Sequence, residues 1–540
     1  MMKETLYYNA KVFTSDLENR EANAFTIKNG KFNWVGDLCD IEEEKELQEI
    51  ERVDLKGRRV LPGFVDSHMH AVMLANCCKQ IAALPPEVFS IEELTAEVKK
   101  RREELGKSKY NNKDFLSDRK LWIEGWGFDE GKFKEKRAPL RWDLDKGAED
   151  VPVYILRSCV HIASVNSKAL ELAGIDRNTK DPEGGIIGRD ENGEPNGLLY
   201  ETARYLVNQL MPPLTDDDLV NNLLDLDKIL LSQGVTTCSD LCEFTECDFE
   251  AVFDRAVKKC FKNKVGYYYL FDYVKKNPDL FAVKIAKSKG LKAKFCGVKL
   301  IGDGSVSGNT AWTDEAGLPT CSEEDIKEAI CWAKENGCQV SMHAMGNKTI
   351  DRAVKMMSEE ENWMEDAPCF RVEHVTMPSK EAIKLASEKG IAFVTQPIFQ
   401  YCEIESYLNN LGAEKTKEIY PIKDWLDNDI KFAFSTDAPA TSWATPSDPM
   451  PGLKSAVNRI AWDGTDLGER HRVSIEEAII RYTSYGAEIL GLKNVGKIKK
   501  NYEADFVVLD KDIIEIEPIL IDTVKVAETY ISGNREYVKE

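Results

Sequence analysis

The sequence predicts a (β/α)₈ barrel with two additions, a small β-sandwich domain built from both chain ends and an inserted α/β subdomain. Three observations lead to this α/β fold. Short apolar runs alternate with amphipathic helical stretches through the middle of the chain, as in a parallel sheet. The two ends carry short extended runs separated by turn residues. The length of 540 residues exceeds the usual size of a single core.

The two chain ends are predicted to form one β domain. Near the start, Asn29-Gly30 lies between two extended runs, which is a strong signal for a type I′ hairpin. Near the end, Ser532-Gly533-Asn534 separates two more extended runs. Because the termini of a compact domain often lie close together, we expect residues 1–60 and 492–540 to make one composite domain.

Residues 61–491 are predicted to form the barrel, with helical stretches such as 323–336 between the apolar runs. The gap between the first two strands is too long for one helix. We therefore expect an insert at about 76–225, with strands at 120–123 and 151–155. The eight barrel strands are expected to end near Asp66, Thr237, Leu270, Lys299, Met342, Glu373, Val394 and Phe434.

Charge and composition restrict the partners of the chain. The formal net charge of −21 would repel the phosphates of a nucleic acid and an anionic membrane surface, so we expect neither as a partner. The start has no apolar stretch long enough for a signal peptide, and no apolar run could span a bilayer. The 14 cysteines show no regular framework, which favours reduced thiols. We expect a cytoplasmic protein.

Histidines mark one end of the predicted barrel. The chain has only six, and four of them fall just past the ends of predicted strands. In a (β/α)₈ barrel that end is the C-terminal face, where active sites are built. The four are His68, His70, His343 and His374.

His68 and His70 form an H-x-H motif. Alternate side chains of a strand share a face, so the motif directs two imidazoles to one point. A bare H-x-H could equally be two surface histidines after a strand. Preceded by Pro62-Gly63-Phe64-Val65-Asp66, it becomes a strong motif.

His343 and His374 each end an apolar strand. Taken singly, either could be a hydrogen-bonded core histidine. Taken with the H-x-H pair, their placement on the same face favours ligation, because neutral imidazole suits zinc and similar ions.

Lys299 ends another apolar run, and a lysine that points into a barrel is costly unless it is paired or chemically altered. A salt bridge to Asp303 is one solution. Beside metal cations the amine could instead stay neutral and react with CO₂. The resulting carbamate would be an anionic ligand that can bridge two metals.

Asp437 follows the last predicted strand. A carboxylate at this point can take a proton from an attacking water and deliver it to a leaving nitrogen. An aspartate that caps a turn before Pro439 is the alternative. Its place in the series of strand ends favours the catalytic role.

These residues, in this order, resemble the amidohydrolase superfamily and, within it, the branch of YtcJ-like proteins, which is similar to N-substituted formamide deformylases. The resemblance covers essentially the whole chain. It includes the closing motif of the β domain, at 496–498 and 504–510, and several motifs of the insert. The insert motifs are at 125–129, 157–161, 166–170 and 184–189.

The resemblance implies one or two zinc ions, or similar divalent metals. His68 and His70 would bind the more buried ion. His343 and His374 would bind a second ion, with Lys299 as a carboxylated ligand. A homodimer is common in such families, although nothing in these residues indicates one.

The resemblance also implies contacts outside the barrel strands. In the insert, Trp126, Arg157 and His161 would bind the substrate, although an insert histidine can simply brace its own loop. His471 matches no functional position and is predicted to lie on the surface.

The predicted reaction is hydrolysis of a non-peptide carbon–nitrogen bond, an amide or an N-formyl or N-acyl amine in a small molecule. Asp437 would contact the metal and move the proton, and His343 or His374 would stabilise the developing oxyanion. The same site could serve a cyclic amidase, a deaminase or an esterase. A non-catalytic barrel that binds a small molecule is the alternative from another class, and the complete ligand set argues against it.

Overall fold

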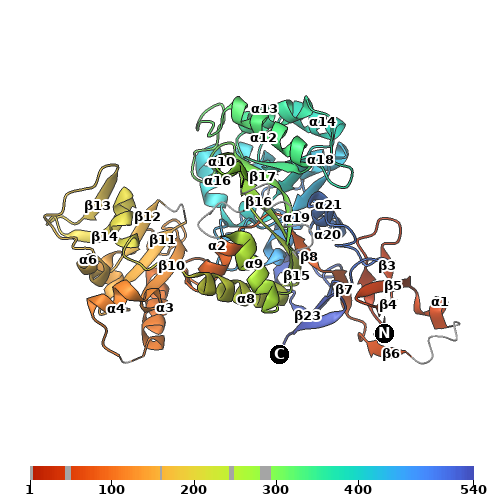
Figure 1. Ribbon diagram of the computed structural model, residues 1–540, viewed down its shortest axis with the longest axis horizontal. Coiled ribbons are helices and arrows are strands. Elements are labelled where there is room, and N and C mark those ends of the chain that lie inside the picture. Colours follow the sequence, from red (N-terminus) through yellow and green to blue (C-terminus); the bar gives the residue numbers. More distant parts are fainter. Residues whose placement is uncertain (1–3, 43–49, 107, 159–160, 242–247, 280–292) are drawn as a thin grey trace. The chain divides into compact units, whose positions relative to one another are not determined.

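The computed structural model describes residues 4–42, 50–106, 108–158, 161–241, 248–279 and 293–540. The chain divides into two compact units (Figure 1). Unit 2 consists of Val72–Asn222 and Ser442–Pro446, and unit 1 is the rest of the chain. None of the helices within the described ranges is long and apolar enough to cross a lipid bilayer.

Unit 1 contains the predicted barrel, a sheet of eight strands in which each strand pairs in parallel with the next one along the chain. The two outermost strands of the sheet approach each other where the Ser67 hydroxyl donates to the Phe434 carbonyl at 3.4 Å. All eight predicted strands are confirmed. They are β8 (Phe64–Asp66), β15 (Val235–Asp240), β16 (Lys264–Leu270), β17 (Ala293–Ile301), β18 (Gln339–Ala344), β19 (Phe370–His374), β20 (Ala392–Thr395) and β21 (Phe432–Phe434).

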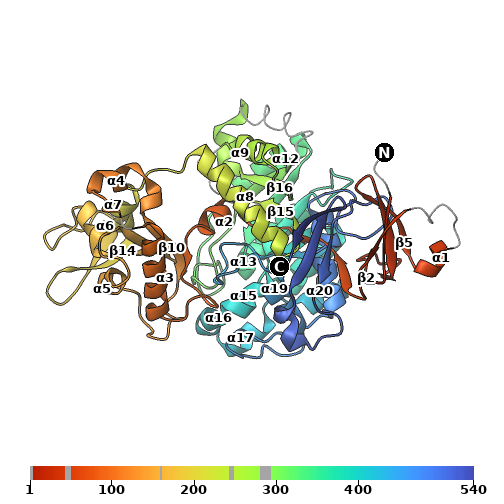
Figure 2. The ribbon, with the colours of Figure 1, turned by 90° about the horizontal axis from the view of Figure 1, so that it is seen from below.

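Helices of unit 1 lie outside these strands (Figures 1 and 2). Local sequence sets their limits, as α12 (Glu323–Asn336) shows. It starts after Ser322, which forms a capping box with Asp325, and it ends at Gly337 in the left-handed conformation. Further helices are α1 (Leu38–Glu42), α8 (Asp216–Ser232), α9 (Phe249–Lys258), α10 (Phe271–Lys276), α13 (Asn347–Ser358), α14 (Lys380–Lys389), α15 (Pro397–Cys402), α16 (Ile404–Leu411), α17 (Ala413–Glu418), α18 (Ile422–Asp427), α19 (Pro449–Asn458), α20 (Ile475–Arg481) and α21 (Ser484–Ile489).

Strands from both chain ends form two sheets that share one core, as predicted, and they lie side by side in Figure 1. Tyr7 and Phe25 of one sheet pack edge-on against Phe506 of the other. Asn29 and Gly30 have φ angles of 53° and 78°, which the type I′ turn between β4 and β5 requires. The strands are β1 (Thr5–Tyr8), β2 (Lys11–Phe13), β3 (Glu21–Ala22), β4 (Ala24–Lys28), β5 (Lys31–Gly36), β6 (Glu51–Asp54), β7 (Arg59–Pro62), β22 (Phe506–Leu509), β23 (Val526–Ile531) and β24 (Asn534–Val538).

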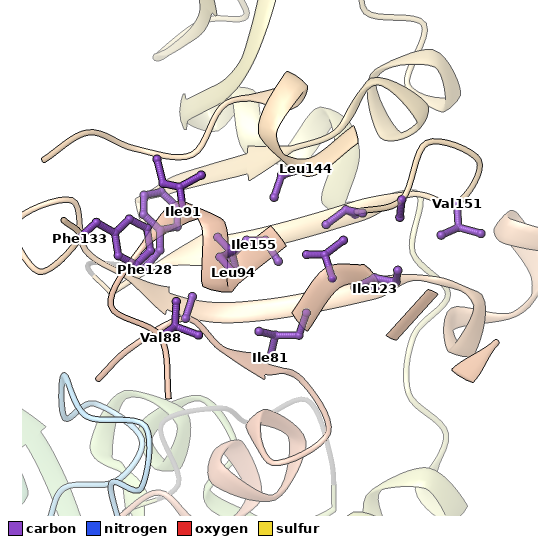
Figure 3. Close-up of a cluster of buried hydrophobic side chains, with 14 of the residues drawn as sticks. Ile81, Val88, Ile91, Leu94, Ile123, Phe128, Phe133, Leu144, Val151 and Ile155 are labelled. Atoms are coloured by element: carbon purple, nitrogen blue, oxygen red, sulfur yellow. The ribbon is translucent and has the colours of Figure 1, made fainter. Parts of the chain in front are cut away.

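Unit 2 is an α/β subdomain around a six-stranded sheet in the order β13-β14-β12-β11-β10-β9. Figure 3 shows one side of its core, where Ile91 and Leu94 of α3 pack with sheet residues such as Ile123 and Ile155. The elements are α2 (Ala71–Cys77), β9 (Ile81–Ala82), α3 (Ile91–Glu104), α4 (Asn112–Ser117), β10 (Ile123–Phe128), α5 (Arg141–Asp145), β11 (Val153–Arg157), β12 (Ile162–Val165), α6 (Ser167–Leu172), β13 (Gly185–Arg189), β14 (Pro195–Glu201) and α7 (Tyr205–Asn208).

The predicted strand at 120–123 is wrong except for its last residue. The Asp118 side chain accepts a hydrogen bond from the Lys120 N–H and starts a single 3₁₀ turn over Arg119–Leu121. The strand β10 begins only at Ile123, after that turn. An aspartate that caps a turn therefore overrides the apolar pattern of the residues that follow it. The limits predicted for the composite domain, the barrel and the insert stay predictions.

Candidate metal centre

Five barrel strands bring the sequence-predicted residues to one end of the barrel. Two residues follow β8, one lies in β17, one in β18, one ends β19, and one follows β21. Because these strands are parallel, their C-terminal ends form one face. Most of these side chains are buried. In chain order they are His68, His70, Lys299, His343, His374 and Asp437.

His68, His70 and Asp437 offer ligand atoms that all lie within 4.8 Å of one another. Asp437 Oδ1 is 3.0 Å from His70 Nε2 and 3.2 Å from His68 Nε2. Burial alone would raise the pKa of Asp437, but His68, His70 and His374 together outweigh it and hold this pKa well below its ordinary value. The carboxylate is therefore ionised at neutral pH beside two imidazoles.

Asp66 joins the two segments that carry this group. Its carboxylate accepts hydrogen bonds from the backbone N–H of His68 at 3.3 Å and of Thr436 at 3.2 Å. The Asp437 N–H in turn donates to the His68 carbonyl at 2.7 Å. Burial raises the pKa of Asp66 to about 6. Asp66 belongs to the motif that precedes His68 and His70, and no role was predicted for it from the sequence.

Glu373 is a second functional residue that sequence reasoning missed. Its buried carboxylate lies 2.6 Å from His68 Nδ1 and accepts from the Ser341 hydroxyl at 2.7 Å. Arg371 donates to both carboxylate oxygens, from Nε at 2.5 Å and from Nη2 at 2.9 Å. Burial would raise the pKa of Glu373, but the charge of Arg371 holds it well below its ordinary value.

A signal for this pair was present in the sequence. Arg371 and Glu373 stand two residues apart in the apolar strand β19, so both side chains point to the same face. Two opposite charges on one face of a buried strand predict an internal ion pair. A carboxylate that holds the far nitrogen of a histidine is a common support for metal ligation.

His374 ends β19 and lies among the other imidazoles. Its ring centroid is 4.4 Å from that of His343 and 4.9 Å from that of His68. Its Nδ1 lies 2.8 Å from Gln396 Oε1 and 4.0 Å from Asp437 Oδ2. Burial and then the neighbouring His343 lower the pKa of His374 well below its ordinary value, which favours neutral imidazole.

His343 contacts the loop that follows β17. Its Nε2 lies 2.9 Å from the Gly304 carbonyl and 3.5 Å from Asp303 Oδ1. Asp303 also accepts hydrogen bonds from the backbone N–H groups of Met345 at 3.0 Å and Gly346 at 2.8 Å. Asp303 therefore holds the loops after β17 and β18 together beside His343.

Lys299 is buried in β17, with 1% of the residue exposed, and pairs in register with Ser341. Its charge contributes to the lowered pKa of both Glu373 and His374. The amine therefore acts electrostatically on the same end of the barrel interior. Its carboxylation stays a prediction.

A protein-family model matches most of the chain, including every residue of the candidate metal centre. Residues 51–537 match the model of the amidohydrolase family. The chain belongs to this family. The predicted family and the predicted barrel are both confirmed, and the chain is an amidohydrolase-family enzyme.

Individual proteins support the same conclusion. The chain is similar to the putative amidohydrolase YtcJ of Bacillus subtilis, at 28% identity over 99% of this chain and 100% of that protein. It is also similar to the N-substituted formamide deformylase of Arthrobacter pascens, at 23% identity over 99% of this chain and 98% of that protein. Among solved structures, an uncharacterized metal-dependent hydrolase from Pyrococcus horikoshii matches with a TM-score of 0.73 at 25% identity. This match covers 95% of the present chain and 99% of the other.

The three insert residues predicted to bind substrate belong to unit 2. Trp126 is buried in a small cluster with Leu84. Arg157 donates to the Glu130 carboxylate at 2.9 and 3.0 Å, and His161 Nδ1 lies 2.9 Å from Glu201. Cys159 and Val160, which precede His161 in the insert motif, lie outside the described residues. Substrate binding by this amidohydrolase through these side chains stays a prediction.

The prediction that His471 lies on the surface is wrong, because none of the residue is exposed. Its Nε2 lies 3.7 Å from Glu418 Oε2. The Leu467 N–H donates to the Arg459 carbonyl and so folds this polar segment back onto the end of α19. The charged neighbours of His471 in sequence, Arg470 and Arg472, concealed this burial.

Proposed function

We propose that this amidohydrolase is metal-dependent and hydrolyses an amide or an N-formyl or N-acyl amine in a small molecule. The observation that carries the proposal is the convergence of His68, His70 and Asp437 at the C-terminal face of the barrel. Two relatives support it by name. One is a deformylase of N-substituted formamides, and one is a metal-dependent hydrolase.

The residues present fit a divalent metal. Two imidazole nitrogens and a carboxylate oxygen, all buried, form the kind of donor set that zinc takes in hydrolases. His68 also has the carboxylate of Glu373 against its other nitrogen, as metal-binding histidines usually do. A metal held here would lower the pKa of a bound water and polarise the carbonyl of the substrate.

The side chains of the site have separate roles in this reaction. Asp437 accepts the proton that the attacking water loses, and it returns that proton to the departing nitrogen. His343 or His374 donates a hydrogen bond to the oxyanion as it develops. Lys299, His343 and His374 are proposed to hold a second metal, with Lys299 carboxylated. Three residues of the insert are proposed to contact the substrate: Trp126, Arg157 and His161. A cytoplasmic location and a homodimer are also proposed.

Metal stoichiometry and turnover test the proposal together. Protein purified without chelators is expected to contain one or two equivalents of zinc or a similar ion, measured by elemental analysis. Asp437→Asn is expected to lower kcat by about 10²–10⁴-fold with metal content nearly intact. N-formyl and N-acyl amines should be hydrolysed faster than cyclic ureides or aminopyrimidines. Protein that neither contains nor takes up metal, or an active Asp437→Asn variant, would overturn the proposal.

A further inference from the structure

Gln396 contacts His374 from the neighbouring barrel strand. It follows β20 directly, and none of the residue is exposed. Its side-chain oxygen Oε1 lies 2.8 Å from His374 Nδ1, and its nitrogen Nε2 donates to the Ser435 hydroxyl at 2.9 Å. The amide therefore connects the imidazole at the end of β19 with the segment that follows β21.

The Ser435 hydroxyl decides which way this amide points. Its oxygen lies 3.3 Å from the Thr395 carbonyl, to which it donates its only proton. The same oxygen must then accept from Gln396, so it faces the Nε2 end of the amide. This orientation leaves the Oε1 end of Gln396 against His374, and a carbonyl oxygen can only accept. His374 must therefore donate from Nδ1.

The backbone of His374 is held from the same strand. His374 and Val375 have φ angles of 70° and 50°, which are rare for residues with a side chain and especially so for a β-branched one. The Thr395 hydroxyl donates to the His374 carbonyl at 2.9 Å and supports this conformation. Phe399 stacks on the imidazole ring with an interplanar angle of 14°. The backbone and the ring plane of His374 are therefore both supported by neighbouring residues, and the tautomer is the remaining variable.

We propose that Gln396 is a positioning residue that fixes His374 as the Nδ1–H tautomer. The unprotonated Nε2 is then the only ring atom that His374 can offer as a ligand, and an amide achieves this without adding a further buried negative charge beside Glu373 and Asp437. With its single N–H donated to Gln396, His374 has none left for the oxyanion, and that donation falls to His343. The use of Nε2 for a metal rests on the proposed function above. The tautomer itself does not, because it follows from protein–protein hydrogen bonds.

Nitrogen-15 labelling of histidine alone tests the tautomer directly in metal-free protein. The chain has only six histidines, so a His374→Gln variant identifies the signals of His374. The expected spectrum shows a protonated Nδ1 and an unprotonated Nε2 for His374 at neutral pH. A His374 protonated at Nε2 would overturn the proposal.

Variants at two adjacent positions separate positioning from general stability. Gln396→Leu keeps the size of the side chain but removes the acceptor. It is expected to give mixed tautomers of His374 and about 10–100-fold weaker zinc binding in a chelator competition. Thr395→Val is the matched control, because it removes the hydrogen bond to the backbone of the same histidine and should leave the tautomer unchanged.

Gln396→Glu keeps the proposal testable if the leucine variant does not fold. A carboxylate can also only accept, so the Nδ1–H tautomer should persist and zinc binding should recover. Loss of the tautomer in Gln396→Glu, or an unchanged tautomer in a folded Gln396→Leu, would contradict the role of Gln396. A wild-type protein that binds neither zinc nor any similar divalent ion but shows the Nδ1–H tautomer would refute the proposed function and leave this inference intact.

Discussion

The Nδ1 atoms of His68 and His374 both face a buried side-chain oxygen, but the two oxygens differ in charge. His68 lies 2.6 Å from a carboxylate oxygen of Glu373, and His374 lies 2.8 Å from the amide oxygen of Gln396. Both arrangements fix a ring inside the same barrel. Only the first one uses an ionised group as the hydrogen-bond partner of the ring.

The charged arrangement needs more support than the neutral one. The charge of Arg371 contributes most to keeping Glu373 ionised, with His68 and Lys299 adding to it. Arg371 donates to both oxygens of Glu373 and further to the Ser67 carbonyl at 2.7 Å. A buried charge without such partners costs several kcal/mol. Gln396 carries no charge, and one hydroxyl, that of Ser435, is enough to orient it. The two histidines should therefore respond very differently when their partners are changed.

Glu373→Gln should have the largest effect on stability. The new amide can still accept from His68, but Arg371 is left buried without its counter-charge. We expect a loss of about 3–5 kcal/mol in the free energy of unfolding of metal-free protein, measured by urea denaturation. A loss as small as that of an ordinary hydrogen bond, about 1 kcal/mol, would show that the two arrangements do not differ in this way.

The double variant Arg371→Met with Glu373→Gln replaces the ion pair beside His68 with neutral side chains. His68 then has an uncharged amide partner, as His374 has in Gln396. The buried charge is gone, and the amide introduced by Glu373→Gln would present its oxygen to His68 as Gln396 does to His374. Much of the stability lost in the single variant should return, because removing both partners of a buried ion pair is often neutral. The same urea denaturation measures this recovery. A double variant less stable than Glu373→Gln alone would contradict the argument.

Removing the serine hydroxyl beside Gln396 or the one beside Glu373 should lower stability less than Glu373→Gln does. The two removals should differ in their effect on the tautomer of the neighbouring histidine. Ser435→Ala deprives Gln396 of the partner that orients its amide, so His374 should show mixed tautomers. Ser341→Ala deprives Glu373 of one of several donors, and a carboxylate has no orientation to lose, so His68 should keep its proton on Nδ1. We expect each variant to lose about 1–3 kcal/mol of stability. Histidine-labelled nitrogen-15 spectra compare the tautomers, and mixed forms at His68 would break the comparison.

The sequence predicted the barrel and the residues at its end because both are local features. Apolar runs mark strands wherever they occur, and a histidine just past a strand end is placed by that strand alone. The parallel order of the strands then brings His68 and Asp437 together. No knowledge of packing between strands is needed for these predictions.

The supporting residues were missed because their roles depend on pairing across the barrel. Glu373 is adjacent to His374 in sequence, yet its carboxylate is hydrogen-bonded to His68, which is 305 residues away. Gln396 has an unremarkable place after an apolar run, and only the spacing of neighbouring strands sets it against His374. His471 was misplaced for the same reason, because a polar segment gave no sign of the tertiary contacts that bury it.

His471 extends the comparison to a histidine whose ring is hydrogen-bonded to neither a carboxylate nor an amide within the described part of the chain, although Glu418 Oε2 lies 3.7 Å from its Nε2. It is fully buried, and neither ring nitrogen has a hydrogen-bond partner among the described residues. Burial, followed by the charge of Arg459, lowers its pKa below the ordinary value of 6.5. Asp424, Arg470 and Glu418 are the other charged groups that act on it.

This burial predicts a small dependence of stability on pH. Because the pKa of His471 is lower in the folded protein, the unfolded chain binds the proton more readily. The contribution is complete above about pH 6.5 and is lost as the pH falls below that value. Urea denaturation should show lower stability at about pH 5.5 than at about pH 7.5, and His471→Leu should reduce this difference. An undiminished difference in His471→Leu would assign the pH dependence to other groups and would remove His471 from the set of buried neutral histidines.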